Sequence, residues 1–397
     1  MGGGARLRAA LVVAQVAGSL VLLIIAGLFT RSLQAAQRAN LGFDASHVVN
    51  FYMDPSELGY RPAQTREFYQ QLLQRVRALP GVETATTASG APLGYYNNFD
   101  ALIIDGYEPP KGQPGPRSGY TITATDYLPT MRIPLLRGRA FTEADDDTAP
   151  YVAIVNQTLA NRYWPNQDAL GRHFKMPMDT KRTIQIVGIA ADARYNGITG
   201  AMNPMFYIPF AQHVALGSLQ TLQVRTQGDP AAMIPEIERV VRGLAPDLPV
   251  FDVKTMTQAI NTLNGLLMFR LGAGFAAVLG ALGLVLSVVG VYGVISYSAS
   301  QRTQEIGIRM ALGAQPRDVL VMVLRQGIMI VLAGLAVGLA CAFAAGRLAG
   351  KFLAVSGADP VTYAVVSMFL ASVALVACYI PARRSMNVDP MVALRHE

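Results

Sequence analysis

Four long apolar runs interrupt an otherwise polar chain. They cover residues 9–30, 266–298, 319–346 and 361–380. Each run reaches the roughly 20 residues with which an α-helix crosses the hydrocarbon core of a bilayer, and residues 271–296 carry no charge. The pattern therefore predicts an α-helical membrane protein with four transmembrane helices.

The first apolar run admits two interpretations. Residues 1–8 are short, basic and glycine-rich, a layout that the start of a signal peptide shares. A signal peptide has a shorter apolar core, however, and the core ends at a cleavage site of small residues. The run continues into Thr30, Arg31 and Ser32 without such a site. We therefore interpret residues 9–30 as a retained transmembrane helix.

The polar region, residues 31–265, contains a weak internal repeat. Its first copy reads as the strand HVVNFYM, a helix from Pro62 and the strand VETATTAS; its second copy reads as LQTLQVRT, a helix after Pro230 and PVFDVK. Two strand–helix–strand units that share one sheet predict a ferredoxin-like α+β body. Between the copies, residues 95–150 are rich in glycine and proline with short β-prone runs, which predicts an inserted β-rich subdomain.

A helical spacing of apolar residues joins this region to the second transmembrane helix. The residues are Met256, Ile260, Leu263 and Leu267, which are spaced three or four positions apart. The spacing predicts a helix that continues from the outer domain into the bilayer.

Small residues recur four positions apart within the predicted membrane helices. Gly272, Ala276 and Gly280 form one such series, and Gly334 and Gly338 form another. This spacing lets two helices approach closely in lipid. Glycine is also simply common in membrane helices, so the pattern alone leaves both interpretations open.

Basic residues set the predicted orientation. The loop 299–318 and the tail 381–397 carry an excess of arginine, including Arg383 and Arg384 in the tail, and such segments stay in the cytoplasm. The predicted order is a cytoplasmic N-terminus (1–8), transmembrane helix 1 (9–30), an outer domain (31–265), transmembrane helix 2 (266–298), a cytoplasmic loop (299–318), transmembrane helix 3 (319–346), an outer loop (347–360), transmembrane helix 4 (361–380) and a cytoplasmic tail (381–397).

The loop 299–318 has the pattern of a short amphipathic helix. Ile306 and Met310 share an apolar face, while Glu305 and Arg309 form an i,i+4 pair on another face. The pattern fits a coupling helix that is offered to a cytoplasmic partner. It fits equally well an interfacial helix that lies on lipid headgroups.

Three stretches carry a resemblance to a known family. They are the loop motif EIGIRMALGA, the ending YIPARRSMNVDPMVALRHE, and IPLLRGRAFTEADD together with VAIVNQTLANRYWP. Together they resemble the permeases related to the macrolide exporter's membrane subunit and to the cell-division permease of the FtsX type. The resemblance covers nearly the whole chain. It implies a MacB-like periplasmic core followed by an FtsX-like permease domain, in the inner membrane of a bacterium.

In that family the loop docks on an ATP-binding cassette subunit. The resemblance therefore implies an ATPase-coupling role for Glu305, Ile306, Gly307, Arg309, Met310, Ala311, Leu312, Gly313 and Ala314. It also implies a second permease module as a partner, in a homodimer or in tandem. The family's full macrolide exporters carry an ATPase domain before the first span, whereas only residues 1–8 precede it here. In this respect the chain resembles one module of the acidobacterial duplicated orphan permeases, as a natural half or a fragment of a longer chain.

Composition supports a membrane protein. Hydrophobic residues make up 52% of the chain and charged residues only 15%, against about 25% charged in a typical soluble domain. The net charge is +7, but the arginines cluster beside apolar runs, which indicates lipid headgroups and topology rather than nucleic acid. Both cysteines, Cys341 and Cys378, lie in apolar runs, so the outer domain has no disulfide framework.

The sequence carries no recognisable catalytic, cofactor-binding or metal-binding motif. It has no GxxxxGK[ST] phosphate loop, no HExxH or CxxC metal pattern and no GxSxG elbow. We therefore predict a protein that is not an enzyme and needs no cofactor. The predicted function is the permease subunit of an ABC transporter, which couples ATP hydrolysis by a separate subunit to a conformational change of a periplasmic domain, for export or mechanotransmission. The alternative is a membrane sensor with a periplasmic ligand-binding domain.

Overall fold

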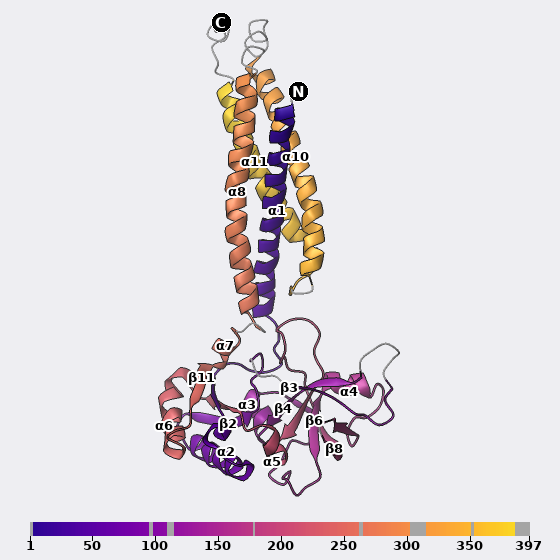
Figure 1. Cartoon of the computed structure of the whole chain (residues 1–397), viewed down its shortest axis with the longest axis vertical. Helices are drawn as coiled ribbons and strands as arrows, with labels where there is room; N and C mark the ends of the chain where they lie inside the picture. Colours follow the sequence, from indigo (N-terminus) through magenta and orange to yellow (C-terminus); the bar gives the residue numbers. More distant parts are fainter. Residues whose placement is uncertain are drawn as a thin grey trace. The chain divides into compact units, whose positions relative to one another are not determined.

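A computed structural model describes residues 3–94, 98–108, 115–177, 179–261, 265–301, 315–350 and 353–385. The chain forms two compact units. A helical unit comprises Met1–Arg38 and Met268–Glu397, and a core domain comprises Ala39–Leu267. Figure 1 labels the elements of both units along the chain.

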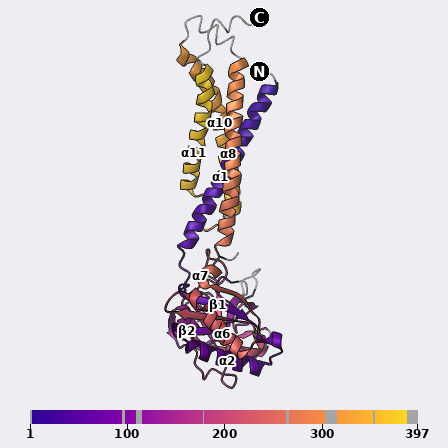
Figure 2. The ribbon, with the colours of Figure 1, turned by 90° about the vertical axis from the view of Figure 1, so that its left-hand side faces the viewer.

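The helical unit contains four long helices. They are α1 (Gly3–Gln37), α8 (Leu267–Gln301), α10 (Pro316–Ala349) and α11 (Pro360–Ser385). All four are long and apolar enough to cross a membrane. They run alongside one another in both views (Figures 1 and 2).

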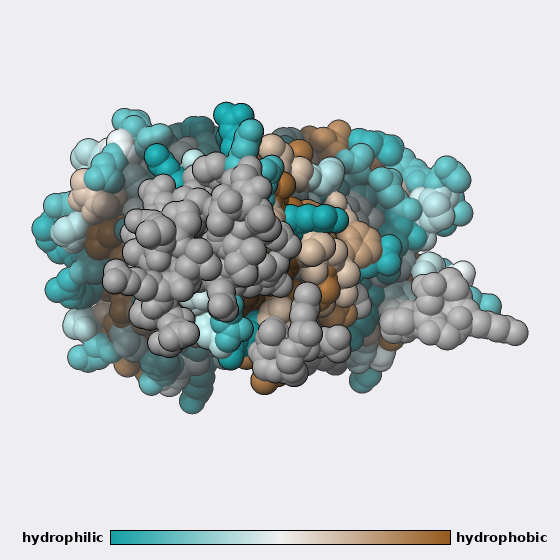
Figure 3. Space-filling model, turned by 90° about the horizontal axis from the view of Figure 1, so that it is seen from above, coloured by the Kyte–Doolittle hydropathy of each residue, from teal (hydrophilic) through white to brown (hydrophobic). Residues whose placement is uncertain are grey.

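Helix α1 is the most enclosed of the four. About 39% of its most apolar window is buried within the protein, compared with 22% for α8 and α10 and 28% for α11. The other helices leave large apolar side chains exposed, such as Phe275 and Val289 of α8, and brown apolar residues are visible on the surface seen from above in Figure 3. Such surfaces are expected for helices that face lipid.

Glycines bring α8 and α10 close to α1. A Cβ atom at Gly280 of α8 would lie 2.9 Å from Leu23 Cδ2, and one at Gly334 of α10 would lie 2.7 Å from Val16 Cγ1. A Cβ atom at Gly338 would lie 3.0 Å from the Cα atom of Ala17. A larger side chain at these positions would push the helices apart. The close-approach interpretation of the small-residue spacing is therefore confirmed at these glycines.

The core domain is built on one 11-stranded sheet. Nine of its strands lie in the order β11-β1-β10-β2-β4-β9-β6-β8-β5, and the other two pair off this path, β3 with β4 and β7 with β8. Its strands are β1 (Val48–Met53), β2 (Val82–Ala88), β3 (Asn98–Ala101), β4 (Arg117–Thr123), β5 (Leu135–Gly138), β6 (Val152–Asn156), β7 (His173–Met176), β8 (Asp179–Ala190), β9 (Met205–Pro209), β10 (Gln220–Thr226) and β11 (Val250–Thr255). Its α-helices are α2 (Pro62–Arg77), α3 (Tyr127–Met131), α4 (Gln157–Tyr163), α5 (Phe210–His213), α6 (Ile234–Leu244) and α7 (Met256–Ala259), and its 3-10 helices are η1 (Pro55–Leu58), η2 (Val214–Leu216) and η3 (Pro230–Met233).

The two repeated units form a ferredoxin-like body. One unit is β1-α2-β2 and the other is β10-α6-β11, and their strands lie in the antiparallel order β11-β1-β10-β2. Leu72 of α2 and Ile237 of α6 belong to the same buried cluster as Phe51 and Leu222 of the sheet. The apolar faces of both helices therefore pack on this part of the sheet, as the repeat predicted.

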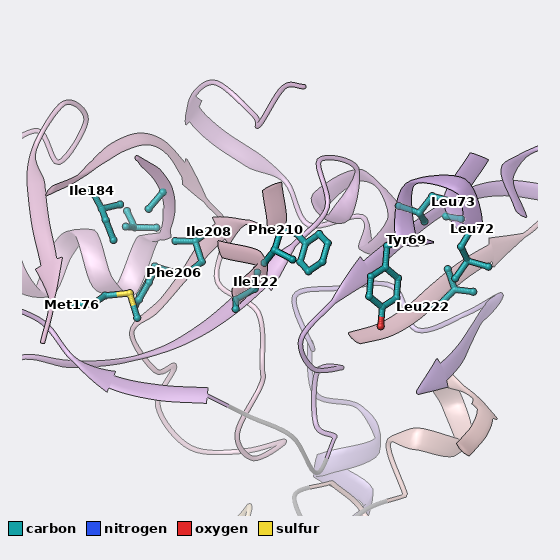
Figure 4. Close-up of a cluster of buried hydrophobic side chains, with 14 of the residues drawn as sticks. Tyr69, Leu72, Leu73, Ile122, Met176, Ile184, Phe206, Ile208, Phe210 and Leu222 are labelled. Carbon is teal, nitrogen blue, oxygen red and sulfur yellow. The ribbon is translucent and has the colours of Figure 1, made fainter. Parts of the chain in front are cut away.

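Strands β3 to β9 lie between the two units in the sequence and extend the same sheet. We call this segment, residues 98–209, the inserted part. It joins the body through the pairing of Ala88 with Thr123. Figure 4 shows Ile122 and Phe210 between apolar residues of the body, such as Tyr69, and those of the inserted part, such as Phe206. One hydrophobic core therefore spans both parts.

The predicted helix from the core domain into the membrane is interrupted. Helix α7 ends at Ala259 and α8 begins at Leu267. The backbone N–H of Leu266 donates to the carbonyl oxygen of Ile260 at 3.1 Å, so the chain turns back at this point. A Cβ atom at Gly265 would lie 1.8 Å from that same oxygen. The prediction of a continuous helix was wrong because a glycine-closed turn separates the two helices.

Candidate coupling site

The loop residues predicted to couple to an ATPase, Glu305–Ala314, lie outside the described residues. The described chain reaches this loop at Gln301 of α8 and resumes at Gln315, whose backbone N–H donates to Asp318 Oδ2 at 3.1 Å at the start of α10. Arg383 and Arg384 lie in the last turn of α11, where the side chain of Arg383 is exposed.

Polar contacts tie the helices together next to this loop. The guanidinium carbon of Arg8 in α1 lies 4.1 Å from the centroid of the Tyr297 ring in α8, a cation–π contact. Ser298 Oγ of α8 donates to Gln326 Oε1 of α10 at 3.0 Å. These two contacts join α8 to α1 and to α10.

A second set of polar contacts joins α1 to the loop between α10 and α11. Arg31 forms an ion pair with Asp359, whose carboxylate also accepts from the backbone N–H of Thr362 at 2.9 Å. Burial alone would raise the pKa of Asp359, but the hydrogen bonds from Thr362 and Arg31 outweigh it and lower this pKa below 3.8. Asp359 is therefore ionised at neutral pH, and the pair is held by opposite charges.

Both chain connections to the helical unit leave the core domain from neighbouring strands. The segment 39–47 follows α1 and enters β1, while β11 leads through α7 towards α8. Strands β1 and β11 pair antiparallel, with Val49 opposite Thr255. The start of β1 and the end of β11 therefore lie side by side.

A buried arginine holds the segment that precedes β1. The side chain of Arg225 in β10 is only 1% exposed. Its guanidinium donates to the carbonyl oxygens of Thr130 at 2.7 Å, Asp44 at 2.7 Å and Ser46 at 2.8 Å, and to Asp44 Oδ2 at 3.3 Å. One side chain thus links the segment 39–47 to α3 and to the centre of the sheet. We call Arg225, Asp44 and Arg132 the anchor cluster.

Electrostatics favour the charged forms of Asp44 and Arg132, whereas burial lowers the pKa of Arg225. Burial alone would raise the pKa of Asp44, but hydrogen bonds from Ser46 and the nearby charges of Arg225 and Arg132 lower this pKa below 3.8. Arg132 lies on the surface, where it bridges Asp44 at 2.8 Å and Glu83 at 3.2 Å. The carboxylate of Asp44 is therefore shared between a buried and an exposed guanidinium.

Backbone contacts fix the same segment at a second point. Gly42 has a positive φ of 76°, and a Cβ atom there would lie 2.0 Å from the carbonyl oxygen of Asp192. The backbone N–H of Arg194 donates to Leu41 O at 2.9 Å. The segment is thus held by the body through Arg225 and by the residues that follow β8 through Leu41 and Gly42.

Sequence reasoning missed the anchor cluster. The available signal was Arg225 itself, a charged residue between Val224 and Thr226 in an otherwise uncharged predicted strand. A charge at such a position is buried only with partners. The partner Asp44 lies 181 positions earlier in the chain, and no local pattern identifies it.

Among the residues that the structure describes, no group of three or more histidine, cysteine, aspartate or glutamate side chains could hold a metal ion. The described part of the site consists of ion pairs and hydrogen bonds that join segments far apart in the sequence.

Comparison with known proteins gives two family matches. Residues 9–240 match the MacB-like periplasmic core domain, and residues 277–390 match the FtsX-like permease C-terminal domain. The first match covers more than half of the chain, and the two matches together overlap all four long helices.

Curated relatives are proteins of export systems. The chain is 25% identical over 295 residues to the macrolide export ATP-binding/permease protein MacB of Marinobacter nauticus. The aligned residues make up 70% of this chain and 43% of that protein. It is 27% identical over 280 residues to the pyoverdine export ATP-binding/permease protein PvdT of Pseudomonas putida. Here the aligned residues make up 66% of this chain and 41% of that protein. The chain therefore spans less than half the length of these relatives.

A solved structure shares a distant likeness. The periplasmic region of MacB from Actinobacillus actinomycetemcomitans aligns with 13% identity and a TM-score of 0.39, covering 56% of this chain and 96% of that one.

Proposed function

Because the chain belongs to the family with a MacB-like periplasmic core domain and carries an FtsX-like permease domain, we propose that it is the permease subunit of an ABC-type export system. Family membership and the four apolar helices place it in the inner membrane, with the core domain in the periplasm. In the proposed mechanism, a separate ATP-binding cassette subunit hydrolyses ATP, the membrane helices move, and the core domain changes conformation.

One observation carries this mechanism. The connections from α1 and to α8 leave the core domain from the adjacent strands β1 and β11, and the anchor cluster fixes the segment before β1 to β10 and α3. In this proposal, a movement between α1 and α8 reaches the core domain at this strand pair, where the anchor cluster holds the segment before β1.

The proposed contact with the ATPase is the loop segment Glu305–Ala314. Its apolar face, Ile306 and Met310, would be buried by the partner, which stabilises a complex by roughly 3–6 kcal/mol for two such side chains. The contacts Arg8–Tyr297 and Ser298–Gln326 support this assignment, because they tie the helices that flank the loop to one another.

Export is the process proposed, because the relatives MacB and PvdT are both named as export proteins. We further propose that two permease modules act together, in a homodimer or in tandem. The chain spans less than half of its relatives, and in this proposal the remaining functions belong to ATP-binding subunits and to the second module.

Co-purification tests the loop assignment. The full chain is expressed with the ATP-binding cassette protein encoded next to it, and the bound ATPase is measured for Ile306→Asp, Met310→Asp and Arg309→Glu. All three variants should lose the ATPase while they still insert into the membrane. Arg75→Glu, a charge reversal at an exposed position of α2 in the core domain, serves as the control. If the three loop variants retain the ATPase as well as the parent does, the coupling role is wrong and the interfacial-helix interpretation stands.

A further inference from the structure

A groove lies in the helical unit between α8 and α11, which run side by side there (Figure 2). It has a volume of about 350 Å³ and is lined by Val288 of α8 and by one face of α11 from Phe369 to Ile380. Both helices are long and apolar enough to cross a membrane, so the groove lies within the bilayer. The proposed coupling mechanism does not use this groove.

The lining of the groove is apolar. Phe369, Val376 and Ile380 remain 52%, 59% and 45% exposed, so the described chain leaves the groove open on its outer side. Ser372 is the only polar residue of the described lining, and its Oγ donates to the carbonyl oxygen of Met368 at 2.8 Å. Because no polar side chain of this lining awaits a partner, a polar ligand would lose its hydration here without compensation. The groove therefore accepts an apolar chain.

The length of the groove matches one leaflet of a bilayer. The stretch of α11 from Phe369 to Ile380 spans about 17 Å at the helical rise of about 1.5 Å per residue. The hydrocarbon core is about 30 Å thick, so each leaflet contributes about 15 Å. The groove therefore extends through the leaflet at the C-terminal end of α11, which is the cytoplasmic leaflet in the predicted topology. One acyl chain of a phospholipid has this reach.

The apolar face of α11 ends at a cation. The face is formed by residues spaced four, three and four positions apart, namely Phe369, Val373, Val376 and Ile380. Arg383 follows three positions after Ile380 and so continues the same face. Its side chain is exposed and makes no ion pair within the part of the chain that the structure describes. A phospholipid whose chain fills the groove would therefore bring its phosphate to Arg383, and a guanidinium donates two parallel hydrogen bonds to such a group.

We propose that this groove binds one phospholipid of the cytoplasmic leaflet, with an acyl chain along α11 and an anionic head group at Arg383. A zwitterionic head group carries its own cation to the same place, which Arg383 repels, so an anionic lipid is preferred. A lipid bound between α8 and α11 stabilises the arrangement of the two helices that it contacts. The proposal rests on the membrane placement of the helices and not on the ATPase-coupling loop, so either proposal can fail alone.

Quenching of tryptophan fluorescence by brominated lipids tests this preference. Trp164→Phe removes the only tryptophan of the sequence, and Phe369→Trp then places one fluorophore in the groove. The control probe is Leu286→Trp in the same background. Leu286 is exposed and lies two positions before Val288, and hence on the other side of α8.

The full chain is reconstituted in vesicles of dioleoylphosphatidylcholine. Phosphatidylglycerol with dibromostearoyl chains, which is anionic, is titrated into one series, and phosphatidylcholine with the same chains, which is zwitterionic, into another. At Phe369→Trp the anionic lipid should bind about fivefold more tightly than the zwitterionic lipid, the factor that one arginine contributes at an anionic surface. At Leu286→Trp the two lipids should bind equally.

Variants locate the binding. Arg383→Gln should abolish the preference at Phe369→Trp, whereas Arg317→Gln, at an exposed arginine of α10 outside the groove, should retain it. Val376→Phe fills part of the groove and should weaken quenching by both lipids, whereas Leu375→Phe, at an exposed neighbour outside the lining, should not. A preference that is equal at the two tryptophans or that survives Arg383→Gln would overturn the proposal. A failure of both lipids to quench Phe369→Trp would also overturn it, because another protein helix would then fill the groove.

Discussion

Replacing Arg225 by methionine should destabilise the core domain severely. The substitution leaves the carbonyl oxygens of Thr130, Asp44 and Ser46 and the carboxylate of Asp44 without this donor. Removing one partner of a buried, hydrogen-bonded charge costs about 3–5 kcal/mol. With a denaturant slope of about 3 kcal/mol per molar urea for a domain of this size, the midpoint of unfolding should fall by about 1–2 M.

The chain offers a convenient probe for this measurement. Trp164 is the only tryptophan of the sequence, and it is buried within the core domain. Its fluorescence therefore follows the unfolding of that domain in the full-length protein in lipid nanodiscs. The matched control is Arg132→Met, since Arg132 contacts the same carboxylate but has a side chain that is 52% exposed, and exposed pairs contribute at most about 1 kcal/mol. If the two variants unfold at the same urea concentration, the buried guanidinium does not hold the segment and the reasoning fails.

Three further predictions follow from the charges and the helix packing. Periplasm-active reporters fused after residues 120 and 355 and cytoplasm-active reporters fused after residues 315 and 397 should all give signal, and a silent fusion at 120 would refute the topology. Gly280→Leu should lower the thermal unfolding temperature of the full chain because a Cβ atom added there would lie 2.9 Å from Leu23 Cδ2, whereas Gly293→Leu, at a position with open space around it, should not. Burial raises the pKa of Asp44 and Asp145, but hydrogen bonds and arginine charges outweigh it, so both lie below 3.8; the unfolded chain then binds more protons, and the stability reported by Trp164 should fall as the pH drops below about 4 and be constant above about 5.

The fold class was predictable because its determinants are local. Four membrane-length apolar runs and a twice-repeated strand–helix–strand pattern can be recognised within short windows of sequence, and the predicted four-helix membrane protein with an α+β outer domain is confirmed. The family resemblance carried by the loop motif, the outer-domain motifs and the C-terminal ending is confirmed as well.

The anchor cluster that sequence reasoning missed depends on distant residues. Arg225 contacts Asp44 and Thr130, and only the completed sheet brings these residues together. The turn between α7 and α8 was missed for a different, local reason. The apolar spacing from Met256 to Leu267 fits a helix, but the chain folds back so that Gly265 lies close to the carbonyl oxygen of Ile260. The predicted coupling residues Glu305–Ala314 stay a prediction.

The enclosed position of α1 has a consequence for biogenesis. Although α1 is synthesised first, the glycines that receive it in α10, Gly334 and Gly338, are translated about 320 residues after Val16 and Ala17. Throughout that interval α1 resides in the bilayer without α10, while the core domain emerges and folds as a unit. Assembly of the helical unit therefore waits until α10 has been translated. With Cys341 and Cys378 replaced by alanine, a cysteine at Val16 should react with a membrane-permeant thiol reagent in nascent chains that end at residue 300 and should become protected only in chains that extend beyond α10.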